Sequence, residues 1–189
     1  MRIIAGEARR RSIMAPKGND TRPTQDYVRE SLFNILMHDV PDAVVLDLFA
    51  GSGALALESI SRGAQEATMV DMAAEAIRCI QQNVESLHFS ERATVLHCDW
   101  QAAIPRLARS GKRFSLVFLD PPYRMENVGE VCTALADADV LAPDALMVVE
   151  HRKHHAPTLD TRFLKQDARL YGDTQIQFYR YQGGAANHA

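Results

Sequence analysis

The segment from Val44 to Leu55, V-V-L-D-L-F-A-G-S-G-A-L, limits the possible folds more than any other part of the chain. Its near-continuous apolar start is typical of a strand that is covered on both faces in a parallel sheet. Gly51 and Gly53 then allow the backbone to turn sharply and to approach a ligand closely. We predict a helix over residues 54–62, and ligands of open α/β sheets bind outside the carboxyl ends of the strands. The segment therefore predicts a nucleotide-type binding site.

The glycine pattern alone leaves the ligand open. G-S-G-A-L-A, from Gly51 to Ala56, is one form of the dinucleotide fingerprint G-x-G-x-x-G/A, and Asp71 follows at about the distance expected of a ribose ligand. An NAD-dependent oxidoreductase is therefore one interpretation. A glycine-rich turn that binds nothing is another, although the strand before it and the helix after it favour a ligand.

Strand-like and helix-like segments alternate along the rest of the chain, which is the pattern of a doubly wound parallel sheet with right-handed crossovers. Two strand-like segments near the C-terminus are separated only by residues 171–173, so we expect them to pair antiparallel. The predicted fold class is α/β, with a mostly parallel seven-stranded sheet and an antiparallel last strand. The expected strands are residues 44–48, 67–70, 93–98, 114–119, 145–149, 163–170 and 174–181.

The first 22 residues differ from the rest of the chain in charge. They hold six Lys and Arg and two acidic residues, a net charge of +4, whereas the remainder holds 15 basic and 22 acidic residues, a net charge of −7. This asymmetry indicates a polyanionic partner at one end of the molecule. We predict that Arg9, Arg10 and Arg11 contact an RNA or DNA backbone, the alternative being a solvated edge. Residues 2–5 and 11–14 are expected to pair as a short hairpin.

We expect three parts in the chain: a basic hairpin extension (residues 1–23), a ligand-binding domain (24–182) and a disordered tail (183–189). Thr24 is predicted to cap a helix over residues 25–38. Glu150 is expected to be a structural acid at the end of a strand, and His151, His154 and His155 to lie in a solvated loop after it.

Composition excludes several classes of protein. The three cysteines form no C-x-x-C pair, so we expect neither a disulfide framework nor a zinc site. No apolar run approaches the length of a membrane span, and the N-terminal segment has no apolar core of signal-peptide length. We therefore expect a cytoplasmic protein without a membrane or metal partner.

Asp120-Pro121-Pro122-Tyr123 is the most specific motif, because it follows a strand about 70 residues after the glycine turn. Its two prolines fix the backbone and remove N–H donors, so the nearby carbonyls stay available as acceptors. A carboxylate, a carbonyl and an aromatic ring suit a planar base whose exocyclic amine donates two hydrogen bonds. Such acceptors also favour the positive charge that develops on nitrogen as it attacks a methyl group. A rigid strand-to-loop turn is the structural alternative.

Residues 47–53 and 120–123 together resemble a class I, S-adenosylmethionine-dependent methyltransferase that modifies an exocyclic amine of a nucleic-acid base. More narrowly, the chain resembles the RsmD family in R-I-I-A-G (2–6), T-R-P-T (21–24), V-R-E-S-L-F-N-I-L (28–36) and L-A-L-E-S-I-S-R-G-A (55–64). The resemblance implies a Rossmann-like fold with S-adenosylmethionine as cofactor. It also implies methylation of N2 of one guanine in bacterial 16S rRNA, position 966 in the usual rRNA numbering, on the small ribosomal subunit. We expect a monomer.

The resemblance further assigns residues to the site. The methionine part of the cofactor is expected near Asp47, Phe49, Gly51, Ser52 and Gly53, its ribose near Asp71 and Met72, and its adenine near Asp99 and Trp100. The target base is expected near Asp120, Pro121, Pro122 and Tyr123. RNA contacts are expected from Arg9, Arg10, Arg11, Arg22 and Thr24. We assign no histidine to catalysis, because the mechanism needs mainly the alignment of amine and methyl group.

Three other functions stay open at this point. A DNA adenine-N6 methyltransferase shares the second motif, although that class often carries a target-recognition domain for which 189 residues leave little room. An NAD-dependent oxidoreductase explains Gly51, Gly53 and Asp71 but neither residues 120–123 nor the basic extension. A non-catalytic RNA-binding protein would need the extension but not the glycine turn, so cofactor binding separates it from the methyltransferases.

Overall fold

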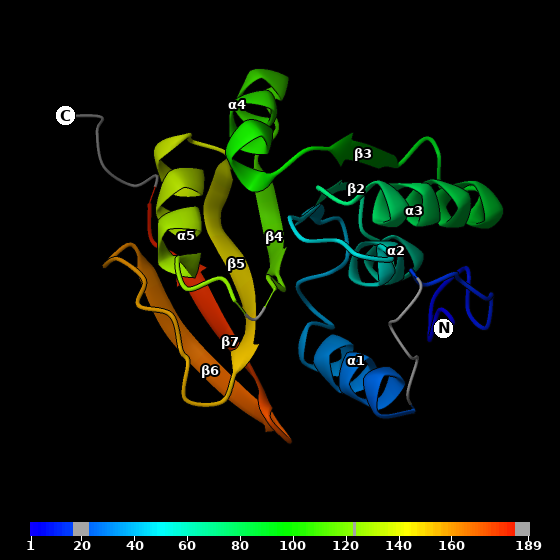
Figure 1. Ribbon diagram of the computed structural model, residues 1–189, viewed down its shortest axis with the longest axis horizontal. Coiled ribbons are helices and arrows are strands. Elements are labelled where there is room, and N and C mark those ends of the chain that lie inside the picture. The colour runs from blue at the N-terminus through cyan, green and yellow to red at the C-terminus, as the bar shows by residue number, and fades with distance from the viewer. Residues whose placement is uncertain (17–22, 123, 184–189) are drawn as a thin grey trace.

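The computed structural model describes residues 1–16, 23–122 and 124–183. Helices and strands alternate as far as the fifth strand, and two further strands follow with no helix between them in the described residues, as Figure 1 shows. The strands are β1 (Val44–Asp47), β2 (Glu66–Asp71), β3 (Ala93–His97), β4 (Phe114–Leu119), β5 (Leu141–Arg152), β6 (Phe163–Tyr171) and β7 (Thr174–Tyr181). The helices are α1 (Pro23–Ile35), α2 (Ala54–Ser61), α3 (Ala74–Leu87), α4 (Trp100–Ser110) and α5 (Val128–Asp137). Within these described ranges, no helix is both long and apolar enough to span a bilayer.

In the described part of the chain, seven strands form one sheet in the order β3-β2-β1-β4-β5-β7-β6. Strands β1 to β5 run parallel, and β7 runs antiparallel to both β5 and β6. The predicted α/β fold with an antiparallel end is therefore confirmed. The direction of strand succession reverses between β1 and β4, so the crevice expected of such a sheet lies at the carboxyl ends of these two strands.

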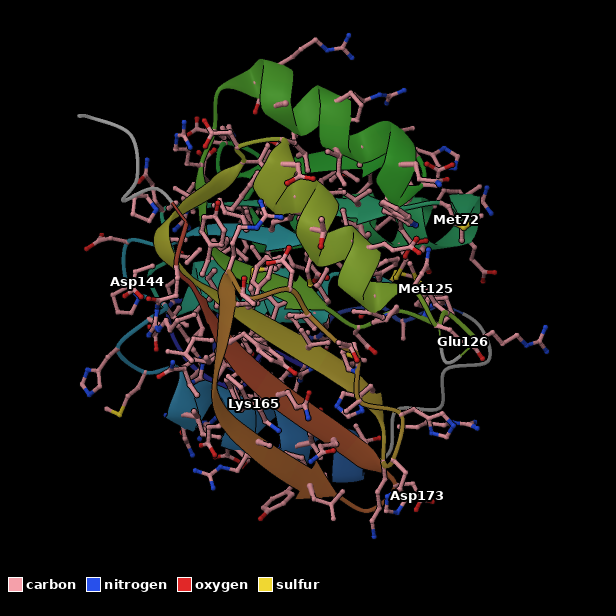
Figure 2. The ribbon with its side chains drawn as sticks, turned by 90° about the vertical axis from the view of Figure 1, so that its left-hand side faces the viewer. Met72, Met125, Glu126, Asp144, Lys165 and Asp173 are labelled. Atoms are coloured by element: carbon pink, nitrogen blue, oxygen red, sulfur yellow. The ribbon has the colours of Figure 1, made fainter. Side chains whose placement is uncertain are left out.

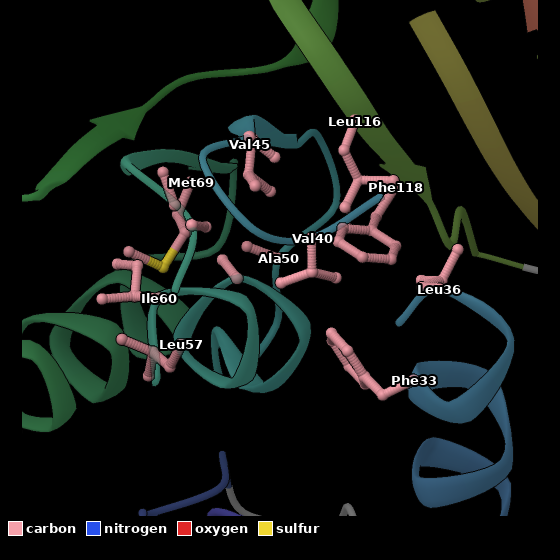
Figure 3. Close-up of a cluster of buried hydrophobic side chains, with 14 of the residues drawn as sticks. Phe33, Leu36, Val40, Val45, Ala50, Leu57, Ile60, Met69, Leu116 and Phe118 are labelled. Carbon is pink, nitrogen blue, oxygen red and sulfur yellow. The ribbon is translucent and has the colours of Figure 1, made fainter. Parts of the chain in front are cut away.

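Helices cover both faces of the sheet, and a cluster of buried apolar side chains lies on each face. Helices α1, α2 and α3 contribute to one cluster, and α4 and α5 contribute to the other. Figure 3 shows the first cluster, in which Phe33 of α1 lies opposite Leu116 and Phe118 of β4. Val117 and Leu119 of the same strand belong to the second cluster. By this alternation, Asp120, the residue after β4, lies on the same face as Leu116 and Phe118.

The N-terminal extension forms the expected hairpin. Arg2 and Ser12 form an antiparallel bridge, and the N–H of Ile3 donates a hydrogen bond to the carbonyl of Arg11 at 2.9 Å. Arg10 occupies the left-handed region with φ of 70°, where the chain turns back. Gly6 also has a positive φ, 82°, so the turn is built from two residues in this conformation.

The hairpin is bound to α2 through buried polar groups. The carboxylate of Glu58, which is fully buried, accepts hydrogen bonds from the N–H groups of Ile4 at 2.8 Å and Ala5 at 3.0 Å. Gly6 lies so close to α2 that a Cβ atom would come within 1.7 Å of the carbonyl oxygen of Ser61. A larger residue at Gly6 would therefore push the hairpin away, and the extension is part of the packed domain.

Some predicted boundaries were wrong. Helix α1 begins at Pro23, so Thr24 lies inside it and is not its cap, because proline suits the first helical position. The helix ends at Ile35 rather than at residue 38, since the chain turns there and the N–H of Asp39 bonds to the carbonyl of Leu36. Strand β5 reaches Arg152, which makes His151 a buried strand residue and not part of a solvated loop.

Candidate functional site

Three carboxylates lie at the carboxyl ends of three neighbouring strands. Asp47 pairs with Phe118 in the β1–β4 register, and Leu119 pairs with Val149 in the β4–β5 register. These pairings place Asp47, Asp120 and Glu150 at the same edge of the sheet. All three line one cavity of about 340 Å³ on the face that α1 and α2 cover.

The glycine turn forms one wall of this cavity. Gly51 and Gly53 have φ angles of 57° and 78°, which are strained for other residues. A Cβ atom on Gly53 would lie only 3.0 Å from Sδ of Met69, whereas one on Gly51 would meet nothing within 4 Å. The turn is therefore packed against the core at Gly53 and open toward the cavity at Gly51. Ser52 between them is buried and also lines the cavity.

Asp71, at the end of β2, braces this turn. Its Oδ2 accepts a hydrogen bond from the N–H of Gly51 at 2.9 Å, and its Oδ1 accepts one from the N–H of Ala73 at 2.8 Å. A carboxylate has about four acceptor sites, so both oxygens keep capacity for a hydroxyl group. The adjacent Met72 has an exposed side chain at the periphery of the molecule (Figure 2).

Asp99 and Trp100 lie after the end of β3, the next strand along the sheet. Asp99 caps α4, because its Oδ1 accepts a hydrogen bond from the N–H of Ala102 at 2.7 Å. Trp100 is the first residue of that helix and packs, partly buried, against the second apolar cluster. Because Asp71 pairs with His97 in the β2–β3 register, these residues continue the same sheet edge. They do not line the cavity that holds Asp47.

The carboxyl groups of the cavity have raised pKa values. Burial is the main cause for Asp47, whose pKa is raised to about 8, and repulsion from Asp120 adds to it. Asp120 is accessible from the cavity, yet desolvation by the surrounding protein raises its pKa as well. The pKa of Glu150 is raised first by burial and then by repulsion from Asp120. A cation that entered this cavity would favour the ionised forms of all three groups.

The two prolines differ in their surroundings. The carbonyl of Pro122 accepts a hydrogen bond from the N–H of Met125 at 2.8 Å, which closes a turn. Pro121 is buried, and no donor among the described residues reaches its carbonyl. Both prolines line a second cavity, of about 890 Å³, on the α5 side of the sheet. Tyr123 lies outside the described residues.

The basic cluster divides into two kinds of residue. Arg9 and Arg10 are exposed on the hairpin. Arg11 is also exposed, but its guanidinium donates hydrogen bonds to the carbonyls of Ser86 and Leu87 at the end of α3. A cation at a helix C-terminus is stabilised by the helix dipole, so Arg11 has a structural partner that the sequence did not reveal. Arg22 lies outside the described residues, and Thr24 lies in the first turn of α1.

Comparisons with known proteins assign the family. The family model described as "Conserved hypothetical protein 95" matches residues 1–180. Ribosomal RNA small subunit methyltransferase D of Escherichia coli (strain K12) is 34% identical over 190 residues, which cover 100% of this chain and 94% of that protein. The chain belongs to the RsmD family. The putative rRNA methyltransferase YlbH of Bacillus subtilis (strain 168), also 34% identical, covers 97% of the chain with 100% of its own length.

Solved structures agree with the RsmD assignment. The Escherichia coli protein named putative methyltransferase yhhF has a TM-score of 0.85 at 35% identity, covering 97% of this chain and 99% of its own. A putative methyltransferase, SMU.776, complexed with SAH, has a TM-score of 0.67 at 14% identity, covering 83% of this chain and 49% of its own. At that identity the second likeness shows the fold alone.

In this RsmD-family chain, the structure brings together only part of the predicted site. The expected methionine-end residues Asp47, Phe49, Gly51 and Ser52 line one cavity with Asp120, and Gly53 supports the turn behind it. The expected nucleoside-end residues lie outside that cavity, along the ends of β2 and β3. The expected RNA-contacting residues of the hairpin do not line it either. In the described ranges, no group of three or more His, Cys, Asp or Glu is arranged to hold a metal ion.

Arg29 also belongs to this site, although its place there was not predicted from the sequence. Arg29 is buried, lines the cavity from α1, and donates through Nη2 to the carbonyl of Arg2 and, at 3.1 Å, to Asp26. Its Nε has no hydrogen-bond partner in the described structure, and burial lowers its pKa. The signal was present, because Arg29 lies four residues before Phe33 and therefore on the same face of the helix.

Proposed function

We propose that this protein transfers a methyl group from S-adenosylmethionine to the exocyclic N2 amine of a guanine in 16S rRNA of the small ribosomal subunit. Guanine 966, in the usual rRNA numbering, is the proposed target. The relatives at 34% identity are by name rRNA methyltransferases, and one of them is a small-subunit enzyme. The observation that carries the proposal is the position of Asp120, whose carboxylate shares a cavity with Asp47 and the glycine turn.

The chemistry of the cavity fits S-adenosylmethionine. This cofactor carries an ammonium and a sulfonium charge, and its sulfonium group supplies an activated methyl. Asp47, whose pKa is raised by burial, would gain a favourable partner from those charges. Asp47 and the open side of Gly51 are proposed to hold the methionine end together with Phe49 and Ser52. Asp71 and Met72 are proposed for the ribose, and Asp99 and Trp100 for the adenine.

Asp120 and the carbonyl of Pro121 are proposed to orient the target amine. Each accepts one N–H of the amine, so the nitrogen lone pair is directed toward the methyl group. The ionised carboxylate also stabilises the positive charge that develops on nitrogen. The methylated nitrogen becomes acidic as the bond forms, so its proton leaves without a strong base. The residues of the site therefore need only to position the amine against the methyl group and to stabilise the charge on nitrogen.

The exposed part of the hairpin is proposed to contact the rRNA. Arg9 and Arg10 point to solvent from a body of net negative charge, and no described residue forms a hydrogen bond or ion pair with either guanidinium, so both are available to phosphates. Arg11, Arg22 and Thr24 complete the predicted set, with Arg11 also bound to α3. A ribosomal substrate would place the protein in the cytoplasm.

Transfer of a labelled methyl group tests the proposal. The substrates are small subunits from a strain that lacks this gene, naked 16S rRNA and duplex DNA, each followed by nucleoside analysis. N2-methylguanosine formed in the subunit would support the proposal, and Asp120→Ala should abolish it without loss of cofactor binding. N6-methyladenine in DNA would instead identify the adenine-N6 alternative. Absence of both transfer and cofactor binding would refute methyltransferase function.

A further inference from the structure

Glu150 lies beside Asp120, although the sequence suggested only a structural acid. Val149 pairs with Leu119, so the next residues of the two parallel strands, Glu150 and Asp120, are also neighbours. In β5, Leu146 and Val148 belong to the cluster under α1 and α2, and Glu150 continues their alternation. Both acids therefore occupy the same face and line the same cavity.

Among the described residues, none donates a hydrogen bond to the carboxylate of Glu150. In the described residues, no hydrogen bond to Glu150 or Asp120 is present, whereas the buried Glu58 accepts three and the bracing Asp71 accepts two. Glu150 is only partly exposed, and it also borders the larger cavity that Pro121 and Pro122 line. Two adjacent acceptors without donors are costly at a partly dehydrated site. They are suited to a ligand that presents two donors side by side.

The base edges of guanine and adenine differ in this respect. Guanine presents the N2 amine and, next to it, the N1–H, which are adjacent donors. Adenine presents the N6 amine next to N1, which is an acceptor in the neutral base. We propose that ionised Glu150 accepts the N1–H of the target guanine while Asp120 accepts its N2 amine, so that Glu150 selects guanine over adenine. This inference rests on the proposed function and extends it to the choice of base.

The protonation of Glu150 determines which base edge it matches. Ionised Glu150 accepts the guanine N1–H, whereas protonated Glu150 would donate to the N1 of an adenine-like base. Burial and the charge of Asp120 both favour the protonated form, so guanine preference should increase as the pH rises. His151 projects to the opposite face of the sheet. The other cavity-lining residues with titratable or charged groups are Asp47, Asp120, Arg29, Tyr171 and Met1, which carries the N-terminal ammonium.

The test changes the hydrogen-bonding edge of the base and one side chain of the protein. Small subunits are reconstituted with rRNA that carries guanine or 2,6-diaminopurine at the target position. Diaminopurine keeps the reactive N2 amine but has an acceptor at N1. For the wild-type protein, kcat/KM should be about 10- to 100-fold higher with guanine than with diaminopurine. With diaminopurine, the carboxylate of Glu150 and the N1 of the base are both acceptors, so no hydrogen bond forms between them. For Glu150→Gln, whose amide can donate to N1, the preference should disappear or reverse.

Comparing the two bases in both proteins isolates the N1 contact. Diaminopurine also changes the group at C6, but a contact there would affect wild type and Glu150→Gln equally. Glu150→Asp, which keeps the carboxylate, should keep the preference for guanine at a lower kcat/KM. Glu91→Gln makes the same charge change on an exposed residue before β3, at the opposite edge of the sheet, and serves as the control. Circular dichroism checks the fold of each variant.

The outcomes separate the two proposals. If wild-type protein methylates no guanine in subunits, the proposed function fails, and the choice of base fails with it. If wild type methylates guanine and Glu150→Gln keeps the wild-type preference, only the role of Glu150 is wrong. Loss of guanine preference in Glu150→Gln, with preference retained in Glu150→Asp and Glu91→Gln, would support it.

Discussion

Glu58→Ala should detach the N-terminal hairpin from α2 and destabilise the protein. The wild-type carboxylate accepts the N–H groups of Ile4 and Ala5 and the Nε–H of Arg62 at 2.7 Å. A hydrogen bond to a charged acceptor contributes about 1.5–3 kcal/mol to stability. Ile4 and Ala5 are half-buried, so water can replace part of this interaction. Arg62 is also partly exposed and can turn to solvent.

The lower end of that range, applied to two backbone groups, gives a loss of about 3 kcal/mol. Such a loss is a large fraction of the free energy of unfolding of a small domain, which is roughly 5–15 kcal/mol. Urea unfolding measures the total loss. Hydrogen exchange at Ile4 and Ala5 measures the local one, because both amides become exposed when the hairpin detaches. Methyl transfer to subunits should fall further than cofactor binding, since the hairpin carries the proposed RNA contacts whereas other segments line most of the cavity.

Two control variants sharpen this test. Glu58→Gln keeps the shape of the side chain but has one acceptor oxygen, so its loss should be smaller than that of alanine. Glu91→Gln changes an exposed acid and should change stability by no more than about 0.5 kcal/mol. A loss below about 1 kcal/mol for Glu58→Ala, with unchanged exchange at Ile4 and Ala5, would show that the carboxylate does not hold the hairpin.

Three further predictions concern the site itself. Asp120→Asn should lower the rate of methyl transfer by about 100-fold, as the loss of other preorganised charge-stabilising groups does. Calorimetry should show that S-adenosylmethionine binding is largely unchanged. A variant with wild-type activity would show that Asp120 has no part in the mechanism. S-adenosylmethionine affinity should rise from about pH 6 to 8, because a bound cation lowers the raised pKa of Asp47 and releases its proton. S-adenosylhomocysteine, without the sulfonium charge, should respond less, and equal responses would contradict the electrostatic argument. Replacing Arg9 and Arg10 with alanine should reduce the slope of log RNA affinity against log salt concentration by about two units, one for each lost phosphate contact. Arg11→Ala should instead mainly lower stability. An unchanged slope would mean that the hairpin arginines do not contact RNA.

The fold could be predicted because its signals are local. The apolar run before Asp47 and the two glycines after it are typical of one strand, one turn and one helix start. The alternation of such units leaves few topologies, and the short turn after Tyr171 requires an antiparallel pair. The predicted start of α1 was wrong because two signals competed there. Pro23 and Thr24 both favour a helix start, and proline occupies the first helical position.

The site was predicted less completely because its contacts are long-range. The sequence places Asp47 and Asp120 at strand ends, but the β4–β5 register is needed to place Glu150 beside them. The cap formed by Asp99 could have been predicted from its position before a helix, and this role limits one of its oxygens. The partner of Arg11 lies 75 residues away along the chain, at the end of α3. Neither periodicity nor composition carries that information.

Asn83 shows why hairpin and cavity should be considered together. It is buried on α3, and its Oδ1 accepts the N–H of Met14 at 2.7 Å, at the end of the hairpin. Its Nδ2 donates to the carbonyls of Met14 at 2.9 Å and Ser52 at 3.0 Å, and Ser52 belongs to the glycine turn. Because Met1 and Ala15 also line the cavity, a displacement of the hairpin would change both its wall and the support of its turn. The proposed RNA contacts on the hairpin would therefore have a direct physical connection to the proposed cofactor site.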